Sequence, residues 1–249
     1  MASTGQAGIG SGRVRGETLV LVHTVPPLVD AFAEWCRELL PGVRLLHILD
    51  EPMLDRIKQR GERAPEDDER LAEHVALAEA VGAGAVLVTC STVSLCVDAI
   101  RERFSVPVLK IDEAMAARAV RSGRRITVVA TADTTLEPSR ILLLEEAGRA
   151  GISVDIDLRL VGQALPALLA GDGVTHDRLV EQAVREEAER SDVVVLAQAT
   201  MARVLKAMAG RPAPVPVLSS PFLALAEVRR ILLSPEPAHA QSTLDEVRP

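Results

Sequence analysis

The stretch GAGAVLVTCSTVSL, residues 82–95, has a near copy in RSDVVVLAQATMAR, residues 190–203. The same shift places TLVLVHT (18–24) on ITVVATA (126–132), and one residue more places VPVLKID (106–112) on VPVLSSP (215–221). Three blocks in one order at one near-constant spacing indicate an internal duplication. The chain is therefore predicted to consist of two homologous halves.

Within each half, short aliphatic and β-branched runs alternate with longer helical patterns. The predicted strands are 18–22, 44–48, 85–89, 108–110, 125–130, 154–160, 193–197 and 215–218. The predicted helices are 27–40, 65–81, 92–103, 113–122, 138–149, 163–170, 177–190, 200–209 and 222–232. Strands that are apolar throughout and separated by helices are typical of parallel sheets covered on both faces.

The predicted fold class is thus α/β, with two pseudo-symmetric lobes, each a parallel sheet flanked by helices. Residues 17–122 form the first predicted lobe and 123–232 the second, between flexible tails at 1–16 and 233–249.

Composition and charge exclude several classes of protein. Hydrophobic residues make up 48% of the chain and charged residues 25%, which excludes wholesale disorder. A net charge of −7 argues against a nucleic-acid partner, and no apolar run is long enough to span a membrane. The first residues lack the apolar centre of a signal peptide, and three cysteines without C-x-x-C fit neither a disulfide framework nor a zinc site. We expect a cytoplasmic protein.

Polar segments follow four of the predicted strands. In open parallel sheets, ligands bind beyond the carboxyl ends of the strands, so two such lobes are expected to share an active site in the cleft between them. The segments are His23-Thr24, Cys90-Ser91-Thr92, Thr131 to Thr135, and Gln198-Ala199-Thr200.

Cys90 ends a buried strand and opens a helix, a position where free N–H groups and the helix dipole favour a thiolate. The same N–H groups can bind a carboxylate. The alternative is that Cys90 is a small buried hydrophobe, as free cysteines commonly are. Cys36 and Cys96, inside helical patterns, are interpreted as core residues.

The V-T-C-S-T segment, the A-T-x-x-T segment of the second half and the duplication together resemble the aspartate/glutamate racemase superfamily, over residues 18–232. This group includes glutamate, aspartate and hydantoin racemases, maleate isomerase and arylmalonate decarboxylase. The resemblance implies a cofactor-independent isomerase in which one cysteine per lobe exchanges a proton next to a carboxylate. It implies that Cys90 is the first catalytic cysteine and that the carboxylate is held by Ser91, Thr92, Thr131, Thr134 and Thr135. His23 and Thr24 fall where amino-acid racemases have an acidic or amide residue and then a small hydroxyl residue.

The second half departs from this pattern. Gln198 stands where the family has its second cysteine, and Ala199-Thr200 where glutamate racemases have Thr-His. An amide cannot exchange a proton near neutral pH, although it can hydrogen-bond an oxygen, so Gln198 and Thr200 are assigned to substrate binding. One thiol still permits racemisation or isomerisation with another group on the second face. It also permits decarboxylation of a malonate-like acid, or covalent attack on a double bond.

His23 is the candidate for the second acid/base, because imidazole titrates near neutral pH. The alternative is a structural strand-end histidine. The predicted partner is a small carboxylate-bearing substrate, and a homodimer or higher homo-oligomer is possible. A non-catalytic ligand-binding relative would also explain Gln198.

Overall fold

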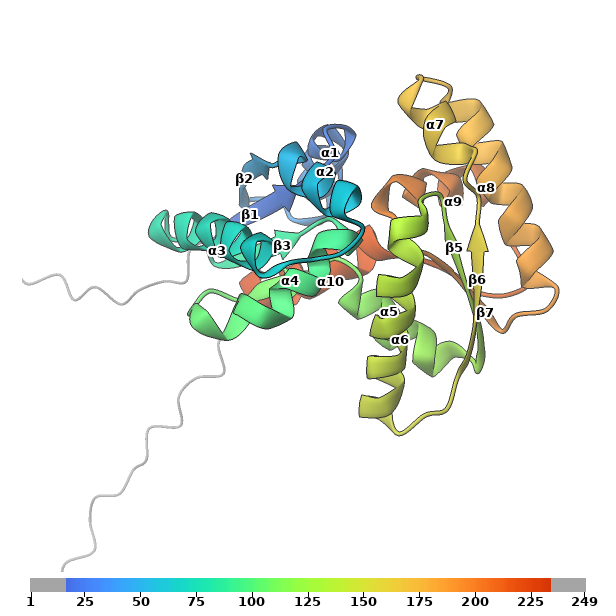
Figure 1. Ribbon diagram of the computed structural model, residues 1–249. Helices are drawn as coiled ribbons and strands as arrows, with labels where there is room; N and C mark the ends of the chain where they lie inside the picture. Colours follow the sequence, from blue (N-terminus) through green and yellow to red (C-terminus); the bar gives the residue numbers. More distant parts are fainter. Residues whose placement is uncertain (1–16, 234–249) are drawn as a thin grey trace, which may run out of the picture.

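Two four-stranded parallel sheets organise the structure, a computed structural model that describes residues 17–233 (Figure 1). The first has the order β2-β1-β3-β4, from β1 (Thr18–His23), β2 (Arg44–Leu49), β3 (Ala85–Val88) and β4 (Val108–Lys110). The second repeats this order as β6-β5-β7-β8, from β5 (Arg125–Ala130), β6 (Asp155–Leu160), β7 (Val193–Leu196) and β8 (Val217–Ser219). The predicted fold class of two α/β lobes is confirmed. The segments 1–16 and 234–249, predicted as tails, lie outside the described residues.

Helices cover both faces of the first sheet. One face packs against α2 (Glu51–Arg60), α3 (Pro65–Ala80) and α4 (Ser91–Ile100), and the other against α1 (Pro27–Leu39) and α10 (Ser220–Leu233). In α1, Leu28, Phe32 and Cys36 recur every four residues and form the buried stripe that faces the sheet. Both faces of the central strands are therefore apolar, as the continuous runs of the sequence predicted.

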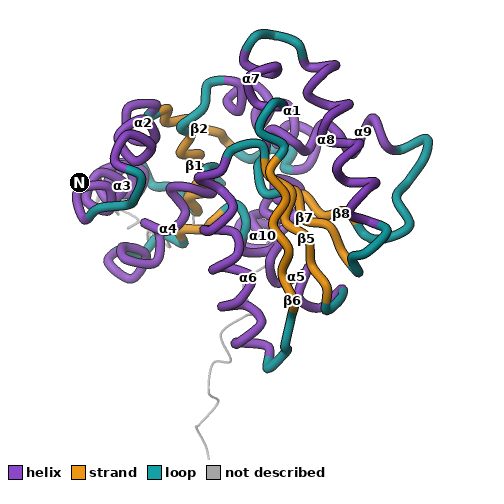
Figure 2. The backbone as a smooth tube through the Cα atoms, turned by 45° about the vertical axis from the view of Figure 1, so that its right-hand side comes forward, coloured by secondary structure: helices purple, strands orange, loops and turns teal. Residues whose placement is uncertain are grey.

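The second sheet is covered in the same way (Figure 2). The helices α5 (Glu113–Ser122) and α6 (Leu136–Ala150) pack on one face, and α8 (Gly173–Ala188) and α9 (Ala202–Met208) on the other. The short α7 (Ala164–Leu169) follows β6 at the carboxyl end of the sheet. Across the described residues, no helix combines the length and apolar character needed to cross a membrane.

The two lobes exchange their last helices. The α5 helix follows β4 of the first sheet, yet Met115, Ala119 and their neighbours are buried in the core of the second sheet. Conversely, α10 follows β8 of the second sheet and buries Leu225 and Val228 in the core of the first. The predicted lobes 17–122 and 123–232 therefore do not coincide with the two cores, because each core draws a helix from the other half, which ties the lobes together.

The strand registers refine the internal repeat. Val22 pairs with Val88 in the first sheet, and Val129 with Leu196 in the second. Cys90 and Gln198 each lie two residues beyond the last of these partners. By the same count Thr24, and not His23, is the counterpart of Thr131. The sequence shift that aligned His23 with Thr131 is wrong by one residue at this strand.

Candidate active site

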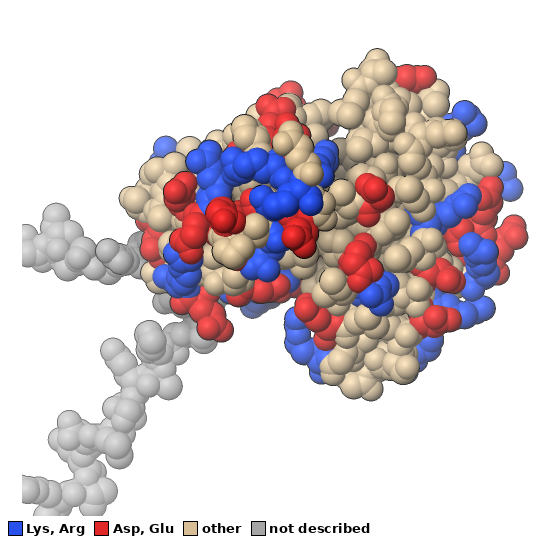
Figure 3. All heavy atoms as spheres, in the orientation of Figure 1, with Lys and Arg blue, Asp and Glu red and all other residues tan. Residues whose placement is uncertain are grey.

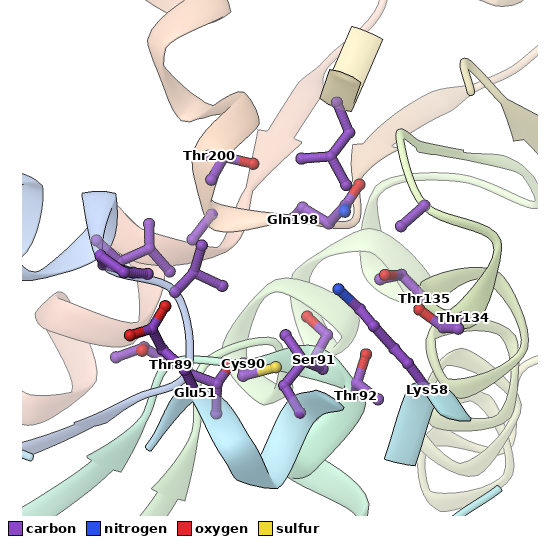
Figure 4. A pocket seen from close by; sticks show the side chains of 18 of the residues that line it. Glu51, Lys58, Thr89, Cys90, Ser91, Thr92, Thr134, Thr135, Gln198 and Thr200 are labelled. Carbon is purple, nitrogen blue, oxygen red and sulfur yellow. The ribbon is translucent and has the colours of Figure 1, made fainter. Parts of the chain in front are cut away.

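A cavity of about 280 Å³ lies between the lobes at the carboxyl ends of the strands (Figure 4). It is lined by side chains of both halves: Thr24, Val25, Pro26, Leu28, Glu51, Leu54, Asp55, Lys58, Thr89, Cys90, Ser91, Thr92, Ala132, Thr134, Thr135, Leu165, Leu169, Gln198, Ala199 and Thr200. The predicted cleft site is thus a cavity that brings together Thr24, Cys90, Ser91, Thr92, Thr134, Thr135, Gln198 and Thr200. Two predicted residues, His23 and Thr131, do not line it.

Cys90 occupies the turn between β3 and α4. Its backbone is extended (φ −120°, ψ 116°), and its carbonyl oxygen accepts hydrogen bonds from Val93 N (3.1 Å) and Ser94 N (2.8 Å), which start the helix. The thiol is partly exposed to the cavity at the positive end of the helix dipole. Cys36 and Cys96 are buried in the cores, as predicted, and burial raises the pKa of each thiol to about 12. Among the described cysteines, Cys90 alone lines the cavity.

Several hydroxyl groups line the same cavity as this thiol. Those of Thr92, Thr134 and Thr135 make no hydrogen bond with a described residue, so their protons are free for a ligand. The 3-10 turn Asp133–Thr135 after β5 brings the last two to the cavity. Ser91 differs, because its Oγ donates to the carbonyl oxygen of Ala197 in the other lobe (3.0 Å). Ser91 thereby joins the two lobes at the site.

Gln198 and Thr131 form a pair that orients the amide. Gln198 Oε1 accepts from Thr131 N (2.5 Å) and from Thr131 Oγ1 (2.9 Å). A backbone N–H can only donate, so this contact identifies the oxygen of the amide and leaves the NH₂ group as the other end. Thr131 uses its donors on Gln198 instead of a substrate carboxylate, contrary to expectation. Within residues 17–233, no side chain or backbone group accepts from Gln198 Nε2.

His23 is part of the first lobe's core. Its ring is fully buried, with Nδ1 2.8 Å from Thr89 Oγ1 and Nε2 3.0 Å from His47 Nδ1. The Thr89 hydroxyl donates to the carbonyl oxygen of Val22 (3.1 Å), so it accepts from His23 Nδ1–H, and His23 Nε2 then accepts from His47. Burial, with a smaller contribution from His47, lowers the pKa of His23 to about 3. This geometry corrects the expectation of a second acid/base, because the ring neither reaches the cavity nor titrates near neutral pH.

Comparison with known proteins identifies the family of this chain. A sequence profile of the Asp/Glu/hydantoin racemases matches residues 23–228, which is most of the chain. The chain belongs to this family. No curated protein sequence matches it.

Solved structures of racemases share the fold. Allantoin racemase from Klebsiella pneumoniae is 21% identical, with a TM-score of 0.65 over 86% of this chain and 87% of that one. The aspartate racemase of Picrophilus torridus is 14% identical (TM-score 0.65; 86% and 92% covered). Glutamate racemase isoform RacE1 from Bacillus anthracis is 19% identical (TM-score 0.63; 88% and 82% covered). At such identities the likeness establishes the racemase-family fold, while the chemistry rests on the residues of the site.

In this racemase-family chain the sequence pattern did not predict the helix α2, and it predicted α7 (as 163–170) without assigning any of its residues to the site. From α2 come Glu51, Leu54, Asp55 and Lys58, and from α7 come Leu165 and Leu169. Signals for α2 are present: Asp50 accepts from Met53 N (3.1 Å) as the N-cap, and Gly61 ends the helix with φ 83°. The mostly polar composition of 51–60 hides the apolar face of Met53, Leu54 and Ile57.

A buried carboxyl group lies near the turn that carries Cys90 in this family member. Asp112 follows β4 and is 3% exposed, with Oδ1 lacking any hydrogen bond to a described residue. Burial raises its pKa to about 6, against smaller lowering contributions from its own backbone, Lys110, Ser91 and Ser94. This carboxyl group therefore lies close to Ser91 and Ser94 in the first turn of α4. No cluster of three or more His, Cys, Asp or Glu side chains that could hold a metal occurs in the described part of the chain.

Proposed function

We propose that this chain is a racemase-type enzyme that moves a proton at the carbon next to a substrate carboxylate, with Cys90 as the acid/base and without a cofactor. The observation that carries the proposal is the position of Cys90. It lies at the start of α4, in a cavity whose nearby hydroxyls, Thr92, Thr134 and Thr135, have no other hydrogen-bond partner among the described residues. Family membership supports the same class of reaction.

The proposed reaction begins with the Cys90 thiolate. It takes the proton of the carbon that bears the carboxylate, an S–H bond forms, and the electron pair of the broken C–H bond moves onto the carboxylate oxygens. Hydroxyl and amide donors at those oxygens stabilise the charge that develops. The helix dipole of α4 favours the thiolate before the transfer. Return of a proton by the same thiol gives exchange with retention, and inversion requires that solvent water deliver the proton to the opposite face.

We propose that Thr24 assists the thiol. In the second sheet, Thr131 donates both its N–H and its hydroxyl to Gln198. The strand registers make Thr24 and Cys90 the counterparts of Thr131 and Gln198. The Thr24 hydroxyl is buried, lines the cavity and has no hydrogen-bond partner among the described residues. We assign it as a donor to the Cys90 thiolate.

The Gln198 amide favours decarboxylation as a second candidate reaction. It occupies the place where a second thiol would serve the opposite face of the carbon, and an amide neither gives nor takes a proton there. In a decarboxylation, the C–C bond to the departing carboxylate supplies the electron pair, CO₂ leaves, and the Cys90 thiol protonates the carbon. One thiol is sufficient for that sequence of steps.

Incubation in D₂O tests both reactions. Amino acids, hydantoins, alkyl- and arylmalonates and maleate are offered to the native chain, and NMR follows deuterium at the α-carbon, loss of CO₂ and alkene isomerisation. Cys90→Ala is expected to abolish turnover. The matched control is Cys96→Ala, which removes a buried thiol of the same helix and is expected to leave turnover within a few-fold.

Exchange with inversion would identify a racemase, and loss of CO₂ a decarboxylase. Turnover that survives in Cys90→Ala would contradict the proposal. If no compound turns over while one of them raises the thermal stability of both the native chain and Cys90→Ala, the chain is a ligand-binding relative.

A further inference from the structure

A single cationic side chain reaches into the cavity. Of the residues that line it, Lys58 is the one Lys or Arg, and its Nζ makes no hydrogen bond or ion pair with any residue of 17–233. Most other basic side chains of the surface are paired with carboxylates, and Figure 3 shows both signs of charge interspersed over the visible face. An unpaired ammonium group in a cavity is a ready partner for an anion.

The helix that carries Lys58 is fixed at both ends. At its start, Asp50 is buried and accepts from Arg70 Nε (2.7 Å) and His74 Nε2 (2.7 Å) of α3. At its end, Arg60 pairs with the buried Asp67 of α3. Between the ends, Met53 and Ile57 pack into the core of the first lobe. The stem of Lys58 therefore starts from a rigid wall of the cavity.

Lys58 points toward the groups predicted to hold the reacting carboxylate. In Figure 4 its side chain runs into the cavity, and Nζ ends on the side of Gln198, Thr135 and Ser91. The Gln198 amide presents its NH₂ group as described above, because Thr131 holds its oxygen. A charged and a neutral donor thus serve the same part of the cavity.

The rest of the cavity opposes a second anion. Glu51 and Asp55 of α2 line it without a basic partner among the described residues, and the remaining wall includes Leu28, Leu54 and Leu165. A substrate with one carboxylate and an apolar or cationic remainder suits this distribution of charge. A second carboxylate would meet two carboxylates and aliphatic carbon, so this inference favours the racemase-type reaction over decarboxylation of a malonate, which carries two carboxylates.

We propose that Lys58 and the Gln198 amide form a clamp on the carboxylate attached to the reacting carbon, and that the substrate is a monoanionic acid. The inference rests on the proposed function, since it takes Cys90 as the thiol that meets that carbon. In this proposal Cys90 takes the proton, so Lys58 is assigned to bind the carboxylate and not to act as the base. The charge that develops on the carboxylate is stabilised by this ammonium group in the transition state.

Alkylation of Cys90 tests the clamp without knowledge of the substrate. Iodoacetate carries its carboxylate on the carbon that the thiolate attacks; an S–C bond forms, the C–I bond breaks and iodide leaves. Iodoacetamide undergoes the same substitution without the charge. The ratio of the two rates at Cys90, measured by mass spectrometry, reports how the cavity attracts an anion at that carbon. Cys90→Ala corrects for labelling of Cys36 and Cys96.

The expected result is a rate ratio about tenfold higher in the native chain than in Lys58→Met, equivalent to about 1.4 kcal/mol. Lys58→Arg retains most of the ratio, and Lys206→Met, which removes an exposed lysine that does not line the cavity, retains all of it. The ratio falls with added salt, since the Debye length shortens from about 30 Å at about 0.01 M to about 3 Å at about 1 M.

Equal ratios in the native chain and Lys58→Met would overturn the clamp while leaving Cys90 as the thiol. With 3-iodopropionate, whose carboxylate is one carbon farther from the thiol, a greater dependence on Lys58 than with iodoacetate would also overturn it, because the cation would then hold a distal group. Failure of both iodoacetate and iodoacetamide to label Cys90 would contradict the proposed function itself, and the clamp with it.

In turnover, Lys58→Met is expected to lower kcat/KM by about 100-fold or more on monocarboxylates. Unchanged turnover of a monocarboxylate, with loss confined to a dicarboxylate, would overturn the substrate class.

Discussion

Replacing Gln198 separates the structural from the chemical role of this amide. In Gln198→Leu, the N–H and hydroxyl of Thr131 lose the oxygen that accepts from them at 2.5 and 2.9 Å. In Gln198→Glu, a carboxylate oxygen still accepts both hydrogen bonds, but the NH₂ group is replaced by a second, negatively charged oxygen. Both variants therefore lose the NH₂ donor, but only Gln198→Leu is expected to lose stability.

The magnitudes follow from the burial of this pair. An unsatisfied buried donor costs about 1–3 kcal/mol, and water in the cavity reduces that cost because Gln198 is only partly buried. We expect Gln198→Leu to lower the free energy of unfolding by about 2 kcal/mol, or about 4–8 °C in Tm for a chain of this size. Gln198→Glu is expected to keep the stability of the native chain. Turnover falls by about 100-fold or more in both variants, because one oxyanion donor is lost.

Urea unfolding at neutral pH measures the stability, and kcat/KM on the acid identified in D₂O measures the chemistry. Thr131→Val, which removes only the hydroxyl donor, is expected to cost about 1 kcal/mol and to add little to Gln198→Leu. A Gln198→Leu variant as stable as the native chain would refute the assigned hydrogen bonds. A Gln198→Glu variant with full turnover would refute the role of the amide as a donor.

Three further predictions concern buried ionisable groups. Burial raises the pKa of Asp112 to about 6, so the native chain loses stability as the pH rises through that value and the buried carboxyl group ionises. Asp112→Asn removes that charge and is expected to raise the free energy of unfolding at pH 7 by up to about 3 kcal/mol. An unchanged free energy of unfolding at pH 7 would contradict this. Burial lowers the pKa of His23 to about 3. The free energy of unfolding of the native chain is therefore expected to fall by up to about 1.4 kcal/mol per pH unit as the pH falls from about 6.5 towards 3. Urea unfolding of His23→Asn should lack this pH dependence. Burial alone would raise the pKa of Asp50, but hydrogen bonds from His74, Arg70 and Met53 have the larger combined effect and lower that pKa. The ionised Asp50 therefore stabilises the fold above the usual aspartate pKa, and this stabilisation is lost as the pH falls through the lowered pKa. Asp50→Asn is therefore expected to cost about 1–2 kcal/mol at pH 7, and a loss that persists unchanged at acidic pH, below the depressed pKa, would argue against the ion pairs.

The sequence by itself determined the lobes and the strand-end segments of the candidate site. The runs LVLV (19–22) and VVVL (193–196) are buried on both faces of a sheet, so their residues had to be apolar at every position. The duplication then predicted two sheets of equal order. Because parallel strands end at one edge, the segments after β1, β3, β5 and β7 were expected to meet, and most of their polar residues do.

Only the tertiary structure decided which side chains face the cavity. His23 and Thr24 are neighbours in sequence, yet the His23 ring turns into the lobe, where Thr89 and His47 bind it, while Thr24 lines the cavity. Successive residues of a strand point to opposite faces, and the residue types alone did not indicate which of the two faces the cavity. Lys58 reached the site from a helix whose placement depends on the buried Asp50 and its partners on α3. Such contacts join residues about 20 positions apart, and the local pattern that predicts a strand or a helix contains no information about them.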